Sequence, residues 1–307
     1  MSLFLLLACP GPDTGETGET AQPNANWHLD AASLGDSMLL GAWEHDSQLV
    51  IVGGNLTSGG GDVYRWDGDI LCREDDVTEE PLWWVHSDGT NLVMVGEKGT
   101  VLLNGERRDV DTEATLFGAW VDGDDLLVVG GTVTENTGEV WRWNGTEWEA
   151  LVTDAPGLVF KVYDTHVIGD DVAWEYDGTS LTKVSNSERL VTVHQDVVVG
   201  GAQGPVVQSW DGTAWVDQDT TWLGQPMNGV HVADGTTWAT GMFGVMAYNE
   251  GSGWQIPDFP LTSEHFHAVR PYGDEVWFVG GNFLNGGTYG TIGRYGGEER
   301  SLSLSGC

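Results

Sequence analysis

The chain has 307 residues, of which 47 are acidic and 12 are basic, so its formal net charge is -35 at pH 7. This charge repels phosphate backbones and anionic lipid surfaces, which argues against nucleic acid as a partner. The hydrophobic fraction of 40% and the sixteen tryptophans exclude a disordered chain, because they supply enough apolar surface for a core.

The N-terminus carries a short apolar run, MSLFLLLAC, which is too short to span a bilayer. Its last four residues, LLAC, resemble the lipobox of bacterial lipoprotein signal peptides. The resemblance implies that residues 1–8 are a signal peptide and that Cys9 is lipidated. The protein would then be anchored at the outer membrane or cell surface. The alternative is an ordinary apolar N-terminus with a chance cysteine.

Residues 10–26, PGPDTGETGETAQPNAN, contain no aliphatic side chain larger than that of alanine. Such a segment cannot bury enough surface to offset the entropy of ordering it. We therefore expect Cys9 and the residues up to 26 to form a flexible acidic tether, followed by one folded domain over 27–307.

Seven short apolar runs that end in glycine follow along this domain. They are LVIVGG (49–54), LVMVGE (92–97), LLVVGG (126–131), THVIGD (165–170), DVVVGG (196–201), TWATGM (237–242) and VWFVGG (276–281). Their marker glycines are Gly53, Gly96, Gly130, Gly169, Gly200, Gly241 and Gly280. The interval averages about 38 residues, which is typical of propeller blades.

Each run follows a polar turn such as Asp88-Gly89 and an earlier apolar strand, which predicts a β-hairpin. A second hairpin follows, such as VWRWNGTEWEAL (140–151), with Asn, Asp or Gly at its tip. Four strands cannot bury both faces of their sheet alone, so the repeats must stack. The sequence therefore predicts an all-β, seven-bladed β-propeller of four-stranded antiparallel blades.

The sequence leaves two ways for the ring to close. The last repeat is expected to form its second hairpin at 292–302, which would complete it. The segment from Trp27 to Ala31 nevertheless resembles an outer strand that would pair with that same repeat.

In the third repeat, Gly130 and Gly131 are followed by Trp141 and, after six intervening residues, by Trp148. This pattern resembles the kelch repeat, and the resemblance extends more weakly over residues 38–304. It implies a kelch-like seven-bladed propeller. One propeller fold hosts many unrelated activities, so the resemblance does not specify the function.

Several polar side chains are expected in the central channel. His265 and His267 open the innermost strand of the last repeat and would share one face. They can begin a metal site, but no third ligand is predictable, so the lining of a wet channel mouth is favoured. Further candidates share one spacing, ten residues before a marker glycine: His86, Trp120, His231 and Arg270.

Three loops that connect second and third strands are long, at 53–62, 130–139 and 280–290. They are rich in Gly, Asn and Thr, and loops on a rigid scaffold often bind partners. Possible ligand-binding residues on them are Asn55, Asn282, Phe283 and Tyr289, which suit sugars or peptides. Neutral insertion at tolerant loop tips is an equal alternative.

Cys72 and Cys307 form an even pair for an oxidising compartment, where one disulfide and two free thiols are both open. The aspartate-rich turns, such as DGDD at 122–125, offer oxygens for calcium, yet their recurrence favours turn formation. We therefore expect no metal and no cofactor.

The function favoured by the sequence is a monomeric, non-enzymatic binding or adhesion module for a glycan or protein partner. An assembly scaffold of an envelope complex is the alternative. A hydrolase or lyase that uses His231, His265 and His267 is a weaker one, because no pattern of nucleophile and base is present, and no catalytic residue is assigned.

Overall fold

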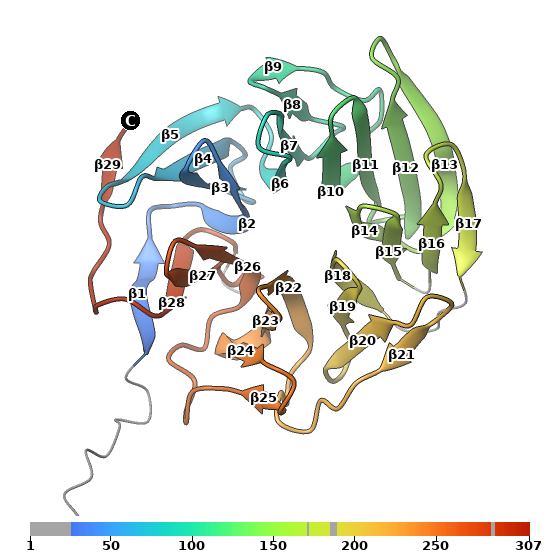
Figure 1. Ribbon diagram of the computed structural model, residues 1–307. Coiled ribbons are helices and arrows are strands. Elements are labelled where there is room, and N and C mark those ends of the chain that lie inside the picture. The colour runs from blue at the N-terminus through green and yellow to red at the C-terminus, as the bar shows by residue number, and fades with distance from the viewer. Residues whose placement is uncertain (1–25, 171, 185–188, 284–285) are drawn as a thin grey trace, which may run out of the picture.

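A computed structural model describes residues 26–170, 172–184, 189–283 and 286–307. The predicted signal peptide, Cys9 and the tether up to residue 25 lie outside the described residues. Seven sheets, each with four antiparallel strands, stand around a central axis (Figure 1), which confirms the predicted seven-bladed β-propeller. Across the described ranges there is no helix with the length and apolar character that crossing a membrane requires.

The strands of each blade follow one another from the channel outward. The first blade contains β2 (Met38–His45), β3 (Gln48–Gly54), β4 (Gly61–Trp66) and β5 (Leu71–Thr78). The second contains β6 (Leu82–Ser87), β7 (Leu92–Gly96), β8 (Val101–Leu103) and β9 (Glu106–Arg107). The third contains β10 (Thr115–Asp122), β11 (Asp125–Thr132), β12 (Thr137–Trp143) and β13 (Trp148–Pro156). The fourth contains β14 (Val159–Tyr163), β15 (His166–Gly169), β16 (Val172–Tyr176) and β17 (Leu181–Val184).

The remaining blades repeat this order. The fifth contains β18 (Leu190–His194), β19 (Val197–Gly200), β20 (Val206–Trp210) and β21 (Trp215–Asp217). The sixth contains β22 (Met227–Ala233), β23 (Thr236–Gly241), the 3-10 turn η1 (Met242–Gly244), β24 (Met246–Asn249) and β25 (Trp254–Gln255). The seventh contains β26 (Phe266–Tyr272), β27 (Glu275–Gly280), β28 (Gly290–Tyr295) and, from the other end of the chain, β1 (Trp27–Leu34).

The marker glycines recur because the innermost strand passes too close for any side chain. A Cβ on Gly53 would lie 1.9 Å from the carbonyl oxygen of Met38, and one on Gly130 would lie 2.1 Å from that of Thr115. In both blades the register shifts by one residue beside this contact, as at a β-bulge. Glycine at this position is therefore a packing requirement of each blade.

The core lies between neighbouring blades. Apolar side chains of the second strands, such as Ile51 and Val95, are fully buried there together with large rings such as Trp277. Because every blade contributes one apolar face to each of its two neighbours, no blade can bury its surface without the others.

The N-terminal strand closes the ring. β1 pairs antiparallel with β28, from Trp27 opposite Tyr295 to Leu34 opposite Gly290, as the outer-strand interpretation predicted. The predicted second hairpin at 292–302 was wrong, because β1 already occupies the outer edge of β28. The chain instead continues past the seventh blade to β29 (Leu304–Gly306).

β29 adds a fifth strand to the first blade, parallel to β5 (Figure 1). Beside it, Cys72 and Cys307 form a disulfide with an S–S distance of 2.07 Å and a Cα–Cα distance of 5.0 Å. Both ends of the folded domain are thus fixed at the junction of the first and seventh blades.

Candidate functional site

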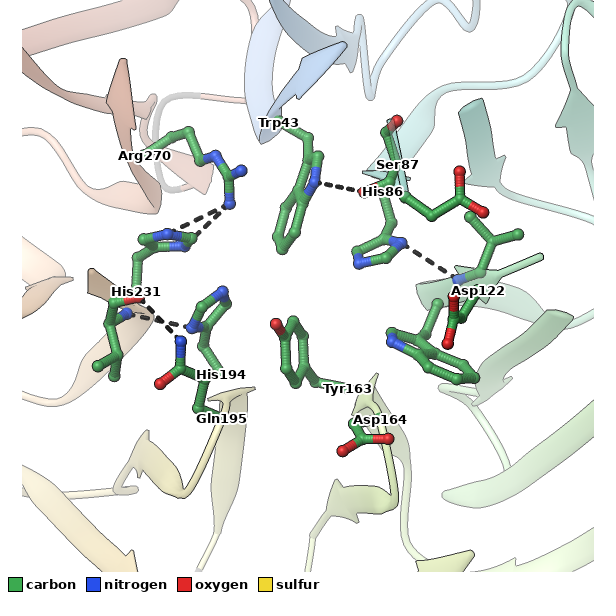
Figure 2. A pocket seen from close by; sticks show the side chains of 14 residues that line it. Trp43, His86, Ser87, Asp122, Tyr163, Asp164, His194, Gln195, His231 and Arg270 are labelled. Carbon is green, nitrogen blue, oxygen red and sulfur yellow. Dashed lines mark hydrogen bonds between the residues drawn. The ribbon is translucent and has the colours of Figure 1, made fainter. Parts of the chain in front are cut away.

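One end of the channel is lined by the same position of every innermost strand. This position is the fourth residue after the one that pairs with the marker glycine. The seven residues are Trp43, His86, Trp120, Tyr163, His194, His231 and Arg270. They line a polar cavity of about 610 Å³ whose rim consists of the turns between first and second strands. We call it the turn-side cavity (Figure 2).

Trp43 occupies the middle of this ring and is almost fully buried. Its Nε1 donates a hydrogen bond to the carbonyl oxygen of Ser87 at 2.9 Å. The guanidinium of Arg270 lies 3.9 Å from the centre of the Trp43 ring, and its Nη1 is 3.1 Å from Nδ1 of His231. Stacking of this kind fixes a cation against an aromatic face.

The three histidines of the ring are buried and neutral at pH 7. Burial lowers the pKa of His86 and of His194 to about 3, and the charge of Arg270 acts in the same direction. Nδ1 of His86 accepts the backbone N–H of Val121 at 3.1 Å, which requires an unprotonated nitrogen. His231 is shifted to a lower pKa in the same way, first by burial and then by His194 and Arg270.

These imidazoles do not form a metal centre. Within the described ranges, no three His, Cys, Asp or Glu side chains come together in a way that would hold a metal ion. The aspartates of the rim serve the turns instead. The carboxylate of Asp88, for example, accepts backbone N–H groups of Thr90, Asn91 and Gly123, and its pKa is about 2.

The opposite end of the channel is mainly apolar. There the residue directly after each glycine partner faces inward: Leu40, Trp83, Phe117, Phe160, Val191, Asn228 and His267. Together with residues of the long loops they line a pocket of about 390 Å³, which we call the loop-side pocket. Its size and aromatic lining are those of a small-ligand or side-chain pocket.

Two of the long loops contribute directly to this pocket. Val133 comes from the loop of the third blade and Phe283 from that of the seventh. The Phe283 ring, 41% exposed, stacks on Trp83 with 5.9 Å between the ring centres. The loops of the first and seventh blades touch, because the Thr57 hydroxyl donates to the carbonyl oxygen of Gly286 at 2.9 Å.

Lys161, on β14, is an unusual member of the pocket wall. Its ammonium group donates to the carbonyl oxygen of Phe117 and lies 4.2 Å from the centre of the Trp84 ring. Burial lowers the pKa of this amine to about 7. No carboxylate of the described part of the chain forms an ion pair with it.

Two histidines also line this pocket. Nε2 of His267 is 3.0 Å from the carbonyl oxygen of Gly281, and burial lowers the pKa of this histidine to about 4. His265 is only 1% exposed, and neither of its ring nitrogens has a hydrogen-bond partner among the described residues. Burial lowers its pKa as well, so the ring is neutral at pH 7, and the residue belongs to the pocket wall.

The structure thus brings together three of the predicted ligand-binding residues, His265, His267 and Phe283, in the loop-side pocket. The Tyr289 hydroxyl donates to the carboxylate of Glu264 at 3.0 Å, directly before His265. His231 lies in the turn-side cavity at the other end of the channel, apart from His265 and His267.

The two predicted asparagines stabilise the conformation of their own loops. The side-chain oxygen of Asn55 accepts the N–H groups of Thr57 and Ser58, so it holds the turn of its own loop. Asn282 precedes Phe283, is nearly buried, and accepts the N–H of Gly287 through its carbonyl oxygen at 3.3 Å.

Sequence reasoning missed Trp43, Tyr163, His194 and Lys161. Trp43 lies ten residues before its marker glycine, Gly53, so the same spacing would have identified it. Tyr163 and His194 lie only six residues before theirs, because the first hairpins of the fourth and fifth blades are four residues shorter. Lys161, within VFKVY, looks like an ordinary polar residue of a strand.

Comparison with known proteins supports the fold but does not indicate a specific activity. No family model matches the chain, and no curated protein matches it. Among solved structures it is similar to YCF48 from Cyanidioschyzon merolae (14% identity, 88% of this chain and 98% of that one, TM-score 0.62). It is also similar to YCF48 bound to D1 peptide (16%, 91% and 100%, 0.58).

A third similar structure is the WD40 β-propeller domain of Doa1, with 10% identity over 89% of this chain and 98% of that one and a TM-score of 0.65. Identities this low carry the architecture but not the activity. By its own sheets and by this likeness, the chain is a seven-bladed β-propeller.

Proposed function

We propose that the protein is a non-enzymatic binding module of the cell envelope, anchored through a lipid on Cys9, that holds a partner at the loop-side pocket. The observation that carries this proposal is the pocket itself. One residue of every blade lines it, including Trp83, Phe117 and Phe160, and two long loops stand over it. The relationship of the repeats to kelch repeats and the location at the outer membrane or cell surface remain predictions.

A protein partner is favoured over a glycan by the chemistry of the wall. Sugar hydroxyls need hydrogen-bond acceptors, and among the described lining residues Asn228 is the one side chain with an amide or carboxylate oxygen. Apolar side chains of a peptide need only the rings that are present. The YCF48 structure with a D1 peptide is a propeller of similar shape that holds a peptide, which supports this choice.

The scaffold alternative would use the same end of the channel, but over a wider contact area and with a permanently bound partner. A scaffold would retain a protein in fixed stoichiometry through a wider part of the loop face. The enzyme alternative loses its proposed constellation, because His231 does not share a cavity with His265 and His267.

The test is an array of peptides, envelope proteins and glycans probed with residues 26–307 and with a Phe283→Ala variant. Deleting the whole loop would be a poor variant, because the Gly281 N–H donates to the backbone carbonyl oxygen of His265 at 2.8 Å and Gly290 begins β28. Phe259→Ala is the matched control, since Phe259 is also exposed but does not line the pocket. Binding that is unaffected by Phe283→Ala would place the partner elsewhere.

The anchor is tested separately. Cys9→Ser in the full chain should release the protein from membranes into the soluble fraction. Membrane association that persists in this variant would contradict lipidation at Cys9.

A further inference from the structure

The wall of the loop-side pocket contains cations and hydrogen-bond donors but no acid. Lys161, Arg189, His265 and His267 line it, and no Asp or Glu does so among the described residues. This absence is notable in a chain with 47 acidic and 12 basic residues. The turn-side cavity is the opposite case, because Asp88, Asp122 and Asp164 stand at its rim.

The amine of Lys161 is the least compensated cation of the wall. It touches a carbonyl oxygen and an aromatic face, which stabilise an ammonium only in part. The other cation, Arg189, lies 5.1 Å from the centre of the Phe160 ring, and its Nε is 3.3 Å from the carboxylate of Asp170. A partly buried charge without an anion is unfavourable, so a ligand that brings an anion would supply the interaction that Lys161 lacks.

His265 supplies the second, independent sign of a ligand. Its side chain is buried, it lines the pocket, and both ring nitrogens lack a hydrogen-bond partner within the described structure. Buried polar groups in folded proteins are nearly always satisfied. A ligand with acceptor oxygens would supply the partners that Lys161 and His265 lack.

We propose that the loop-side pocket binds a monocarboxylate attached to an aromatic or branched apolar body. The carboxylate accepts from Lys161, and the body packs against the rings of Trp83, Phe117 and Phe160, of which Phe117 contacts both others. This proposal rests on the binding function proposed above and names its ligand chemistry. The same chemistry is found in a free organic acid and at the C-terminus of a polypeptide.

Calorimetric titration with four ligands tests the proposal and separates the two sources. The ligands are 3-phenylpropionate, 3-phenylpropionamide, and the peptide acetyl-Gly-Gly-Phe as its free acid and as its amide. We expect at least one acid to bind about tenfold or more tightly than its own amide, because the hydrogen bonds to a carboxylate are charge-assisted. Preference for the free acid or for the peptide acid identifies the source. Equal affinity of acid and amide in both pairs would overturn the proposal.

Two lysine variants locate the carboxylate. Lys161→Met should remove the difference between acid and amide, and Lys183→Met, on the exposed edge strand β17, should preserve it. Lys161, Lys98 and Lys183 are the three lysines of the chain, so acylation by acetic anhydride can be followed at each by mass spectrometry. The preferred acid should protect Lys161 and leave the other two unchanged. Equal protection of all three would place the carboxylate elsewhere.

The outcomes also separate this proposal from the general binding function. If partner capture on the array depends on Phe283 while neither acid exceeds its amide, the binding module stands and its carboxylate chemistry is wrong. If an acid binds at Lys161 but no partner is captured through Phe283, the pocket is a small-molecule site and the partner-binding function is wrong.

Discussion

Nε of Arg294 donates a hydrogen bond to the carboxylate of Asp30 at 2.6 Å, although 264 positions separate the two residues in the chain. Both side chains have no exposed surface. Nη1 of Arg294 also reaches the carboxylate of Glu275 at 2.8 Å. Because Asp30 is on β1 and Arg294 on β28, this ion pair fixes the N-terminal strand on the last blade.

The first prediction concerns this closure. Asp30→Asn removes one charge from a buried pair and leaves the Arg294 guanidinium with less compensation. We expect the free energy of unfolding to fall by about 3–5 kcal/mol, measured by urea titration. Asp69→Asn, in an exposed turn, is the control and should change it by less than about 0.5 kcal/mol. Equal effects of the two changes would show that closure does not depend on the ion pair.

The second prediction concerns the bond between Cys72 and Cys307. Its ends are 235 residues apart, so it restricts the unfolded chain strongly. Replacing both cysteines with serine should lower the stability by about 2–5 kcal/mol, and reductant should lower that of the wild type alone. Non-reducing peptide mapping should recover the linked pair. Two alkylatable thiols in protein purified without reductant would disprove the bond.

The third prediction concerns acid sensitivity. The folded-state pKa of His86 and of His194 is about 3, below the unfolded value of about 6.5, so the unfolded chain binds more protons between these values. Stability should be insensitive to these groups above pH 6.5. It should fall as the pH decreases from 6.5 towards 3, by up to about 1.4 kcal/mol per pH unit for each histidine.

Urea titrations at pH 7.5, 6 and 5 measure this slope, and His86→Gln provides the comparison. Glutamine can still accept the backbone N–H of Val121 but does not titrate. The slope of the variant should be shallower by about 1.4 kcal/mol per pH unit. Parallel slopes would mean that His86 is not held neutral by the fold.

The fourth prediction concerns the cost of Lys161 to the fold. Its pKa of about 7 in the folded protein lies below the ordinary value of 10.5, so stability contributed by this group rises with pH between 7 and 10.5. Lys161→Met should raise the free energy of unfolding at pH 7 by about 1–3 kcal/mol and flatten its rise towards pH 9. Urea titration of wild type and variant at both pH values measures these differences. A variant less stable than the wild type would contradict the view that Lys161 lacks a compensating partner.

The hairpins were predictable because their chemistry is local. Asn144-Gly145, for example, carries its turn preference in two adjacent residues, and Gly145 has a positive φ of 93°. Closure was not predictable in the same way, because Gly296 and Gly297 look like a hairpin tip until β1 is known to occupy the outer edge. Only the tertiary structure brings Asp30 to Arg294.

The channel was predictable where its spacing is regular and hidden where it is not. His86, Trp120, His231 and Arg270 share one interval to the marker glycine, and the structure places all four in the turn-side cavity. Tyr163 and His194 were missed because their hairpins are shorter, which places them six and not ten residues before the marker glycine. The role of Lys161 depends on the aromatic rings that other blades place around it. The local sequence VFKVY gives no sign of those rings.

The direction of β1 gives the molecule a polarity. The strand starts at Trp27, beside Tyr295 at the turn side of the blades, and ends at Leu34, beside Gly290 at the loop side. The chain therefore enters the ring from the turn side. The start of β1 and the loop-side pocket therefore lie on opposite faces of the ring. If Cys9 carries the predicted lipid, its tether joins the folded domain on the face with the aspartate-rich turns, and the pocket keeps the other face to itself.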